Sequence, residues 1–241
     1  PNILGGVLAI SLILVAYLLA QRKMIRSWRE ALSSILLFIF YFISLTALFF
    51  TFSRSGWLAY GVGLAGVGVA LAWQRDRWII GRFLALVFFS LIMSFMIAFP
   101  YRELAFARTS GAWQGEGRLE QKSLSERWEY LDESKEIIQE NWLIGTGVGN
   151  YVVVVGKKDG YSQDPWSYQP VHNAYLLLLA QSGVVALVSF LAFLFFFVKK
   201  DRRAAYTGAV VAALLVIMIF DHWLISLPFG WIFLLLILGL L

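Results

Sequence analysis

The sequence contains no cysteine and only two histidines, His172 and His222, which are fifty positions apart. The lack of cysteine excludes disulfides, thiolate metal sites and a cysteine nucleophile, and it leaves the redox compartment open. The chain also lacks the Asp-x-Asp and His-x-x-x-His patterns of metal sites. We therefore predict no metal and no cofactor, and we expect arginines to handle any charge on a substrate.

Charged residues are scarce as well. Only 15% of the 241 residues are charged, whereas 60% are apolar. Ordinary soluble domains have about 25% charged and roughly 45–50% apolar residues, so the composition argues against a soluble enzyme. Because the sequence begins with Pro1 and ends within an apolar run, we expect it to be part of a longer protein.

Seven apolar runs are candidates for crossing about 30 Å of hydrocarbon, which takes roughly 20 helical residues. Backbone polar groups must be paired in lipid, and the alternating pattern of barrel strands is absent, so these spans are predicted to be helices. The predicted fold class is all-α, a polytopic integral membrane helical bundle. The runs are 3–20, 31–52, 57–73, 83–99, 174–198, 204–220 and 229–241, the last cut short by the end of the sequence.

The distribution of charge predicts how the chain is oriented. Eleven cations lie in the short loops 21–30, 75–82 and 199–203, so the positive-inside rule makes that side cytoplasmic. Transmembrane helices are thus expected in 1–99 and 172–241, with an extracytoplasmic loop domain in 100–171. That loop domain is net −3, so most of the overall charge of +5 reports topology. A nucleic-acid partner is not predicted.

The turn Phe52-Ser53-Arg54-Ser55-Gly56-Trp57 places an arginine at the outer face, where a cation brings no topological benefit. Guanidinium forms a bidentate fork for phosphate. Ser53, Ser55 and the free N–H groups at the start of the next helix would reinforce such an anion site. The alternative is an arginine that snorkels from a helix end.

In the long loop, Ser123-Leu124-Ser125-Glu126 has the spacing of a capping box and predicts the start of an amphipathic helix. Arg127 follows on the first turn, beside Glu126 and Glu129, and is either a site residue or one partner of a surface ion pair. We expect the helix to rest on the membrane or on the bundle. Its predicted apolar face consists of Leu124, Trp128, Leu131, Ile138 and Trp142.

Three alternating glycines, Gly145, Gly147 and Gly149, follow this helix and precede Asn150. Glycine permits tight turns and lets the backbone come close to a ligand. We therefore consider Gly147, Gly149 and Asn150 candidate substrate-binding residues, although the segment is equally compatible with a simple turn.

His172 and Asn173 stand where the outer loop re-enters the membrane. The unperturbed pKa of histidine suits proton transfer near neutrality, which makes His172 a candidate base. Alternatively, the two residues cap the fifth span, since asparagine is a good N-cap. At the outer end of a later span, Asp221 could orient a base or pair with an arginine. Asp221-His222-Trp223 could equally mark the interface, with Trp223 in the aromatic belt.

Gly61, Gly63, Gly66 and Gly68 match Gly-x-Gly-x-x-Gly, but no strand precedes them and they lie inside an apolar run. We interpret them as small residues that let helices pack closely rather than as a dinucleotide site.

In their order and their placement on one membrane face, these motifs resemble the superfamily of O-antigen ligases and O-antigen polymerases. The resemblance covers essentially the whole chain and corresponds to the C-terminal part of such a protein. It implies a C-type glycosyltransferase in the bacterial cytoplasmic membrane, with its active site facing outside. The matching pieces are Pro1-Asn2, Ser53-Arg54-Ser55-Gly56, Arg127 followed by 142–150, and His172-Asn173-Ala174-Tyr175-Leu176 followed by Gly183.

The resemblance also implies partners and roles. The donor would be a glycan on undecaprenyl diphosphate, and the acceptor a lipid A core, a growing glycan or a protein hydroxyl. Arg54 and Arg127 would hold the diphosphate and His172 would activate the acceptor. Asp221 would correspond to an acidic group near the last spans. Two other interpretations remain open: a transporter or flippase for a lipid-linked or anionic solute, and a non-catalytic subunit of polysaccharide assembly.

Overall fold

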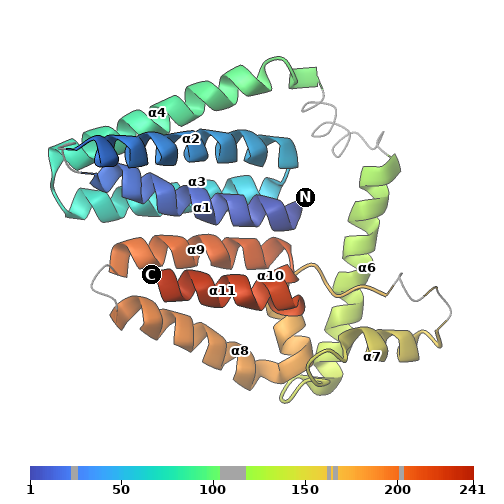
Figure 1. Ribbon diagram of the computed structural model, residues 1–241. Coiled ribbons are helices and arrows are strands. Elements are labelled where there is room, and N and C mark those ends of the chain that lie inside the picture. Colours follow the sequence, from blue (N-terminus) through green and yellow to red (C-terminus); the bar gives the residue numbers. More distant parts are fainter. Residues whose placement is uncertain (23–26, 104–117, 162–163, 165–167, 201–203) are drawn as a thin grey trace. The chain divides into compact units, whose positions relative to one another are not determined.

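The computed structural model describes residues 1–22, 27–103, 118–161, 164, 168–200 and 204–241, and for 118–124 and 204 only the backbone. All regular structure in these residues is helical, which confirms the predicted all-α class. Figure 1 shows the helices α1 (Asn2–Gln21), α2 (Trp28–Thr51), α3 (Arg54–Trp73), α4 (Arg77–Ala98), α6 (Arg118–Asn141), α7 (Tyr151–Lys158), α8 (Ala174–Lys200), α9 (Ala204–Phe220), α10 (Trp223–Ser226) and α11 (Pro228–Leu240).

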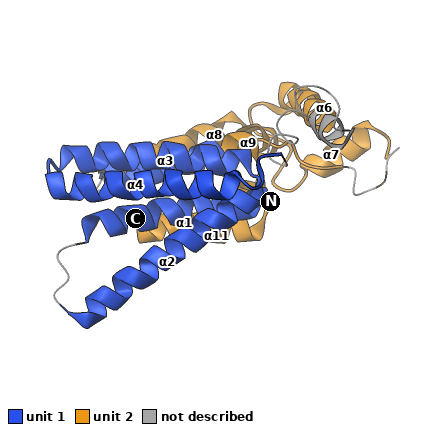
Figure 2. Ribbon diagram, turned by 90° about the horizontal axis from the view of Figure 1, so that it is seen from above, with its two compact units in different colours: residues 1–107, 200–217 blue, residues 108–199, 218–241 orange. Residues whose placement is uncertain are grey.

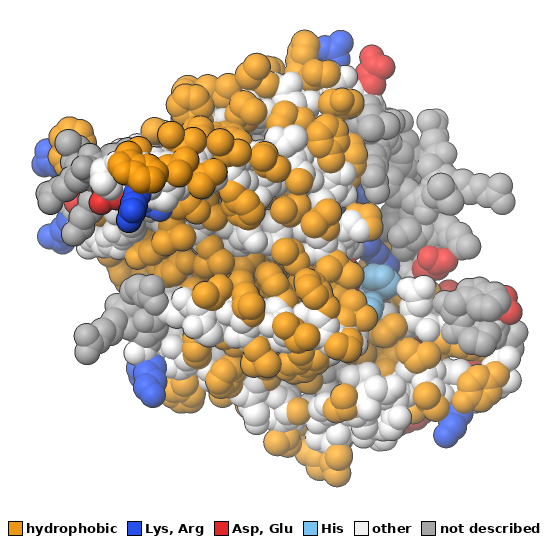
Figure 3. Space-filling model, viewed as in Figure 1, with side chains coloured by type: hydrophobic (Ala, Val, Ile, Leu, Met, Phe, Trp, Pro, Cys, Tyr) orange, Lys and Arg blue, Asp and Glu red, His pale blue; other side chains and the backbone are white. Residues whose placement is uncertain are grey.

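Within the described residues, α1, α2, α3, α4 and α8 are long and apolar enough to cross a membrane. They coincide with five of the predicted spans, while the apolar helices in 205–220 and 228–240 are shorter. Many large apolar side chains on the long helices are exposed, among them Phe88, Leu91 and Phe195. Hydrophobic side chains cover much of the face seen in Figure 3. Apolar surface of this extent is typical of helices that face lipid, so the chain is a multi-pass membrane protein.

The structure describes some of the loop cations on which the predicted orientation rests. The Nη1 of Arg22 donates to Ser33 Oγ at 2.6 Å, and the Nε of Arg82 donates to the carbonyl of Trp78 at 3.2 Å. Arg77 and Arg82 lie within α4, so the predicted loop 75–82 is shorter in the structure. Lys23, Arg26, Arg202 and Arg203 lie outside the described residues. The side of the membrane on which these loops lie stays a prediction from the sequence.

The helices group by packing into two compact units, which Figure 2 distinguishes by colour. Unit 1 comprises Pro1–Ala107 and Lys200–Ile217, and unit 2 comprises Arg108–Lys199 and Met218–Leu241. This grouping follows contacts between residues. The three-part division at residues 99 and 171 follows the membrane side expected from the sequence, and it remains a prediction.

Glycines on α3 set the packing of unit 1. A Cβ atom on Gly63 would lie 2.1 Å from Ile13 Cδ1, and one on Gly66 would lie 2.6 Å from the Cβ of Ala209. Such distances are well below van der Waals contact, so only glycine lets α3 approach α1 and α9 this closely. The interpretation as a helix-packing surface is confirmed for Gly63 and Gly66, whereas a Cβ atom on Gly61 would meet nothing within 4 Å.

In unit 2, α6 begins earlier than the sequence predicts. The helix starts at Arg118, so Ser123 lies inside it and does not cap it. The residues before Ser123 include arginine, leucine, glutamate, glutamine and lysine, all strong helix formers, and they carry the helix through the expected start. The capping-box prediction is therefore wrong.

The buried face of α6 also differs from the predicted one. Ser134 and Ile137 are fully buried, whereas Trp128 and Trp142 are 66% and 56% exposed. Leu131 and Ile138, which were predicted for the apolar face, are only partly buried. The packed face holds α7 and the first turns of α8 around one cluster of buried residues: Ile137, Tyr151, Val155, Tyr168, Val171, Leu177 and Ala180.

α8 is interrupted at Gly183, whose φ of 76° and ψ of 177° are not helical. Figure 1 shows the bend in the ribbon. The segment 142–147 inserts its backbone here and takes over the bonds that the helix loses. The amides of Thr146 and Gly147 donate to the carbonyls of Ala180 and Gln181, each at 2.9 Å, and the amide of Val184 donates to the carbonyl of Trp142 at 2.9 Å.

Candidate active site

His172 lies between two other rings in unit 2. Its imidazole stacks on Tyr130 of α6, with ring centroids 5.9 Å apart and 13° between the planes. On another side it meets His222 edge to face, at 5.3 Å and 78°. Its Nδ1 is buried and makes no hydrogen bond to any described residue. Buried polar atoms are rarely left unpaired, so this nitrogen marks a place where a bound molecule can supply a partner.

Asn173 fixes the chain directly after His172. Its Oδ1 accepts hydrogen bonds from the amides of Tyr175 and Leu176, both at 3.0 Å, which makes Asn173 the N-cap of α8. Its Nδ2 donates to the carbonyl of Ile219 at 3.0 Å and thereby ties the start of α8 to the end of α9. The capping alternative is confirmed for Asn173, whose amide oxygen and nitrogen are both used in these contacts, but His172 takes no part in the cap.

Asp221 holds the backbone at His222, the second histidine of the pair. This buried carboxylate accepts from the amides of His222 at 2.8 Å and Trp223 at 3.4 Å, through the same Oδ1. The Nδ1 of His222 lies 2.6 Å from Ser226 Oγ, which holds the second imidazole against α10. Trp223 itself is 1% exposed and packs on Phe233, so its predicted place in an aromatic belt is wrong.

The surroundings of the two histidines favour their neutral forms. The pKa of His172 is lowered, mainly by burial. The carboxylates of Asp221 and Glu126 oppose this shift, and the charge of Arg127 adds to it. Burial likewise lowers the pKa of His222, with Asp221 acting against it and His172 adding to it. At neutral pH His172 is therefore an uncharged imidazole that can accept a proton.

Arg127, predicted as a phosphate ligand, lies on α6 three residues before Tyr130. Residues three apart share a face of a helix, so Arg127 and Tyr130 point to the same side. Arg127 is half-buried, and its charge acts on the pKa of His172. Unit 2 thus brings together His172, Asn173, Asp221 and Arg127 from the predicted residues.

Sequence reasoning missed Tyr130, because an aromatic residue on an amphipathic helix is usually attributed to packing. The signal that could have identified it is its spacing of three from Arg127. Groups of three or more histidine, cysteine or acidic side chains able to hold a metal are absent from the described residues.

Arg54 is the first residue of α3, in unit 1. Phe52 has a φ of 51° and ends α2, and Ser53 caps α3 by accepting the amide of Gly56 at 3.2 Å. Both predicted serine ligands are buried. The hydroxyls of Ser53 and Ser55 lie 3.1 Å apart, and Ser53 also donates to Asn2 Oδ1 at 3.3 Å.

Arg54 is exposed, whereas its serine neighbours are 1% and 8% exposed. The hydroxyls therefore hold the turn in shape. Of these three side chains, that of Arg54 is the exposed one.

The glycine segment after α6 contributes to the fold of unit 2. The amide of Gly147 is used at the interruption of α8, and Asn150 Nδ2 donates to the carbonyl of Thr146 at 3.1 Å. Gly149 has open space around the position of a Cβ atom. The turn interpretation accounts for these contacts, and the substrate-binding role of Gly147, Gly149 and Asn150 stays a prediction.

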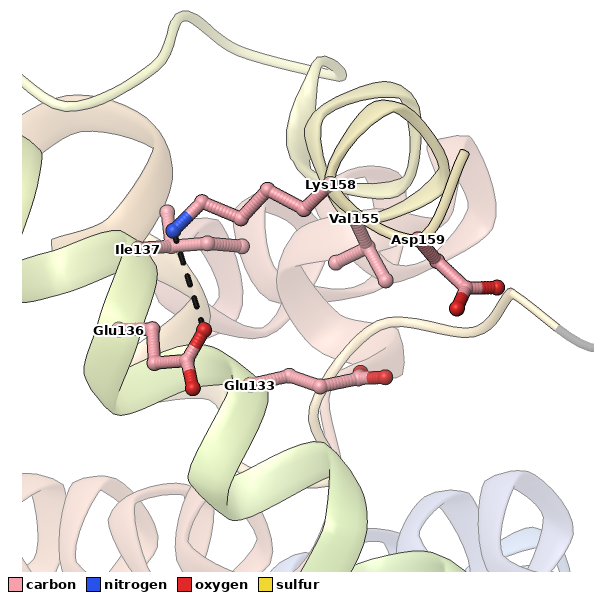
Figure 4. A pocket seen from close by; sticks show the side chains of 6 residues that line it. All are labelled: Glu133, Glu136, Ile137, Val155, Lys158 and Asp159. Carbon is pink, nitrogen blue, oxygen red and sulfur yellow. Dashed lines mark ion pairs between the residues drawn. The ribbon is translucent and has the colours of Figure 1, made fainter. Parts of the chain in front are cut away.

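An acidic pocket of about 210 Å³ lies between α6 and α7. Figure 4 shows Lys158 of α7 turned toward Glu136 of α6, at 3.9 Å, and Lys158 also pairs with Glu140 at 2.6 Å. Glu133 has a buried Oε2 without a hydrogen bond to the described residues. Burial, with help from Glu129, Asp159 and Glu136, raises the pKa of Glu133 to about 7. The sequence signal for this pocket is the series of glutamates three or four apart along α6.

The comparisons with known proteins give one family. A family model described as O-antigen ligase matches residues 39–191, which is more than half of the chain and includes Arg54, Arg127 and His172. Asp221 and His222 follow the matched region. Neither the curated proteins nor the solved structures contain a match to the chain.

Proposed function

Because the chain belongs to the O-antigen ligase family, we propose that it transfers a glycan from an undecaprenyl-diphosphate carrier to an acceptor hydroxyl. The acceptor is a lipid A core, a growing glycan or a protein hydroxyl. We place the reaction on the outer face of the bacterial cytoplasmic membrane, since the loop domain 100–171 carries Arg127 and leads into His172. Membership of the family supports a membrane glycosyltransferase. The donor, the acceptor and the membrane side are our proposal.

The observation that carries the proposal is the environment of His172. A neutral imidazole whose buried Nδ1 has no hydrogen bond to the described residues is held between Tyr130 and His222. Such a group can take the proton of an acceptor hydroxyl as the oxygen attacks the anomeric carbon. The new glycosidic C–O bond forms while the bond from the anomeric carbon to the diphosphate breaks. The electron pair of that bond leaves with the lipid diphosphate.

The leaving group gains negative charge in this step, and arginine can stabilise it without a metal ion. We assign this role to Arg127, on the face of α6 that also presents Tyr130. We assign a second diphosphate contact to Arg54, because it is the exposed cation of a turn whose buried serines hold it in place. Asp221 and Asn173 position the two histidines and the start of α8.

The test is transfer in native membranes supplied with undecaprenyl-diphosphate oligosaccharide and a panel of the three acceptor types. Removing a general base lowers the rate by about 10²–10⁴-fold, so we expect His172→Gln to lose transfer to that extent. Gln139→Ala, on the exposed side of α6, is the matched control and should keep normal transfer. Transfer is expected to survive EDTA.

Normal transfer by His172→Gln would refute the role of His172 as the base. Absence of transfer by the parent protein to every acceptor type would contradict the proposed reaction. Loss of activity in EDTA that returns with a divalent cation would contradict its metal independence.

A further inference from the structure

The interruption at Gly183 divides α8 into two segments with different surroundings. In the first, Leu177 and Ala180 are fully buried against the cluster that holds α6 and α7. In the second, Val185, Phe193 and Phe196 are 62%, 52% and 62% exposed. The first segment therefore packs on the helices of the loop domain. The second presents apolar side chains outward, as a lipid-facing helix does.

The length of the second segment is at the lower limit of what crosses a bilayer core. It runs from Val184 to Lys200, about 25 Å at 1.5 Å per residue, against a hydrocarbon core about 30 Å thick. Lys199 and Lys200 end the segment, and lysines at a span end reach the headgroups through their flexible side chains. If these lysines mark one membrane boundary, Gly183 lies at the other.

The segment 142–148 is fixed at the same level, because its backbone bonds to both sides of the interruption. Trp142 accepts from the amide of Val184, and Gly147 donates to the carbonyl of Gln181, each at 2.9 Å. A Cβ atom on Gly183 would lie only 2.1 Å from the carbonyl oxygen of Leu143, so the two backbones touch. The segment cannot move along α8 without losing these contacts.

Four large apolar side chains of this segment are exposed, two of them by about half and two almost fully. Trp142 is 56%, Leu143 48%, Ile144 78% and Val148 83% exposed. No charged residue occurs between Glu140 and Lys157, so nothing in the sequence of the segment opposes contact with lipid. Tryptophan is enriched at membrane interfaces, where its ring is amphipathic.

We propose that Trp142, Leu143, Ile144 and Val148 form a membrane-insertion loop that lies in the interfacial region of the phospholipid bilayer, on the side of α6 and α7. Lipid is favoured over another protein because the apolar surface of the loop is continuous with that of the second segment of α8. The loop is bonded to the end of a segment whose own exposed side chains face hydrocarbon, so the apolar surface continues from the span into the loop. The loop anchors the end of α6 to the membrane surface.

The absence of cysteine from the sequence allows a direct test with single spin labels. Ile144→Cys and Val148→Cys report on the loop. Lys135→Cys, on the exposed side of α6, is the aqueous reference, and Phe193→Cys, on the second segment of α8, is the lipid reference. Each labelled protein is reconstituted in phosphatidylcholine–phosphatidylglycerol vesicles. Collision rates with oxygen, which concentrates in lipid, and with a water-soluble nickel chelate are then measured by electron paramagnetic resonance.

We expect the oxygen-to-nickel ratio at residues 144 and 148 to exceed the ratio at residue 135 several-fold and to approach that at residue 193. Because all four sites are exposed, the substitutions should leave the circular dichroism spectrum and the melting temperature close to those of the parent. A ratio equal to that at residue 135 would overturn the proposal. Dipolar broadening between labels, which indicates a second copy on the loop, would also overturn it, as would shielding from both collision partners, which indicates a protein partner.

Discussion

The ring of Tyr130 lies parallel to the ring of His172, with the centroids 5.9 Å apart. The two residues come from different parts of the chain, one from the middle of α6 and the other from the residues that precede α8. Because Tyr130 belongs to α6, the stacked ring makes the orientation of the imidazole depend on the position of α6. Tyr130 is a positioning residue for the proposed base.

Replacing Tyr130 tests this role. Tyr130→Ala removes the supporting ring and should lower kcat of glycan transfer with a smaller effect on KM, because the base loses its orientation. Tyr130→Phe keeps the ring, so its kcat should return to near the parent value. Steady-state transfer kinetics in membranes distinguish the two variants. Equal losses in both would mean that the hydroxyl, and not the stacked ring, matters.

Asp221→Asn should change the pH dependence of transfer. The reaction needs neutral His172, so the rate falls as the pH drops through the pKa of this residue. Burial lowers that pKa and the Asp221 carboxylate partly opposes the effect by raising it. Removing the negative charge lowers the pKa further, and the acidic limb of the rate profile moves to lower pH. Asparagine keeps an oxygen for the amides of His222 and Trp223, so these two hydrogen bonds are retained. A limb that stays in place or moves upward would contradict the assignment.

Arg54→Lys should weaken the proposed diphosphate contact. Lysine keeps the charge but loses the bidentate fork, and hydrogen bonds to charged groups contribute about 1.5–3 kcal/mol each. We expect a loss of at least about tenfold in kcat/KM of transfer, at unchanged protein levels in the membrane. Arg82→Lys, on the second turn of α4 at the end predicted to be cytoplasmic, serves as the matched control. Parent-like transfer by Arg54→Lys would remove Arg54 from the proposed site.

Gly183→Ala should destabilise unit 2 through a direct clash. Its Cβ atom would lie 2.1 Å from the carbonyl oxygen of Leu143, and the φ of 76° is unfavourable for alanine. We expect a loss of about 3 kcal/mol or more in the free energy of unfolding. Gly149→Ala is a matched control, since its φ of 81° is similar but nothing lies within 4 Å. It should cost only about 1–2 kcal/mol. Thermal unfolding in detergent compares them, and equal losses would show that strain alone is responsible.

Glu133→Gln should change how stability depends on pH. The pKa of Glu133 is about 7 in the folded protein and 4.5 as a free side chain. The folded state therefore holds more protons between these values, and this group makes stability fall as the pH rises from about 4.5 to about 7. The variant should melt at a higher temperature than the parent at pH 8 and at a similar temperature at pH 4.5. A difference of the same size at both pH values would mean that the carboxylate charge is not the cause.

The spans could be predicted from the sequence because a long apolar run in lipid has few alternatives to a helix. The interruption of α8 could not. The run 174–198 contains no charged residue, and a glycine within it resembles the packing glycines of α3. What makes Gly183 different is the segment 142–147, some forty residues earlier, whose amides replace the bonds within the helix. A contact between distant segments leaves no periodic signal in either of them.

The candidate site, like the fold, could be predicted only in part from the sequence. His172 and Arg127 could be proposed from the sequence because their residue types carry the chemistry. Tyr130 was missed because its contribution is the position of its ring, which depends on how α6 packs against α8. Ser53 and Ser55 were predicted as ligands from their chemistry alone. Their burial and mutual hydrogen bond follow from the close approach of α1 to this turn, where a Cβ atom on Gly5 would lie 2.5 Å from that of Ser53.

The backbone bonds between the segment 142–147 and α8 also constrain the order in which the protein is made. The segment is synthesised before Gly183, so the groups that complete the broken helix exist when α8 forms. Near lipid, unpaired amides and carbonyls would cost several kcal/mol each. Stable integration of α8 therefore requires that α6 has already reached the side of the membrane where the interruption lies. On the proposed topology, a delay in exporting residues 100–171 would leave α8 without its partner during synthesis.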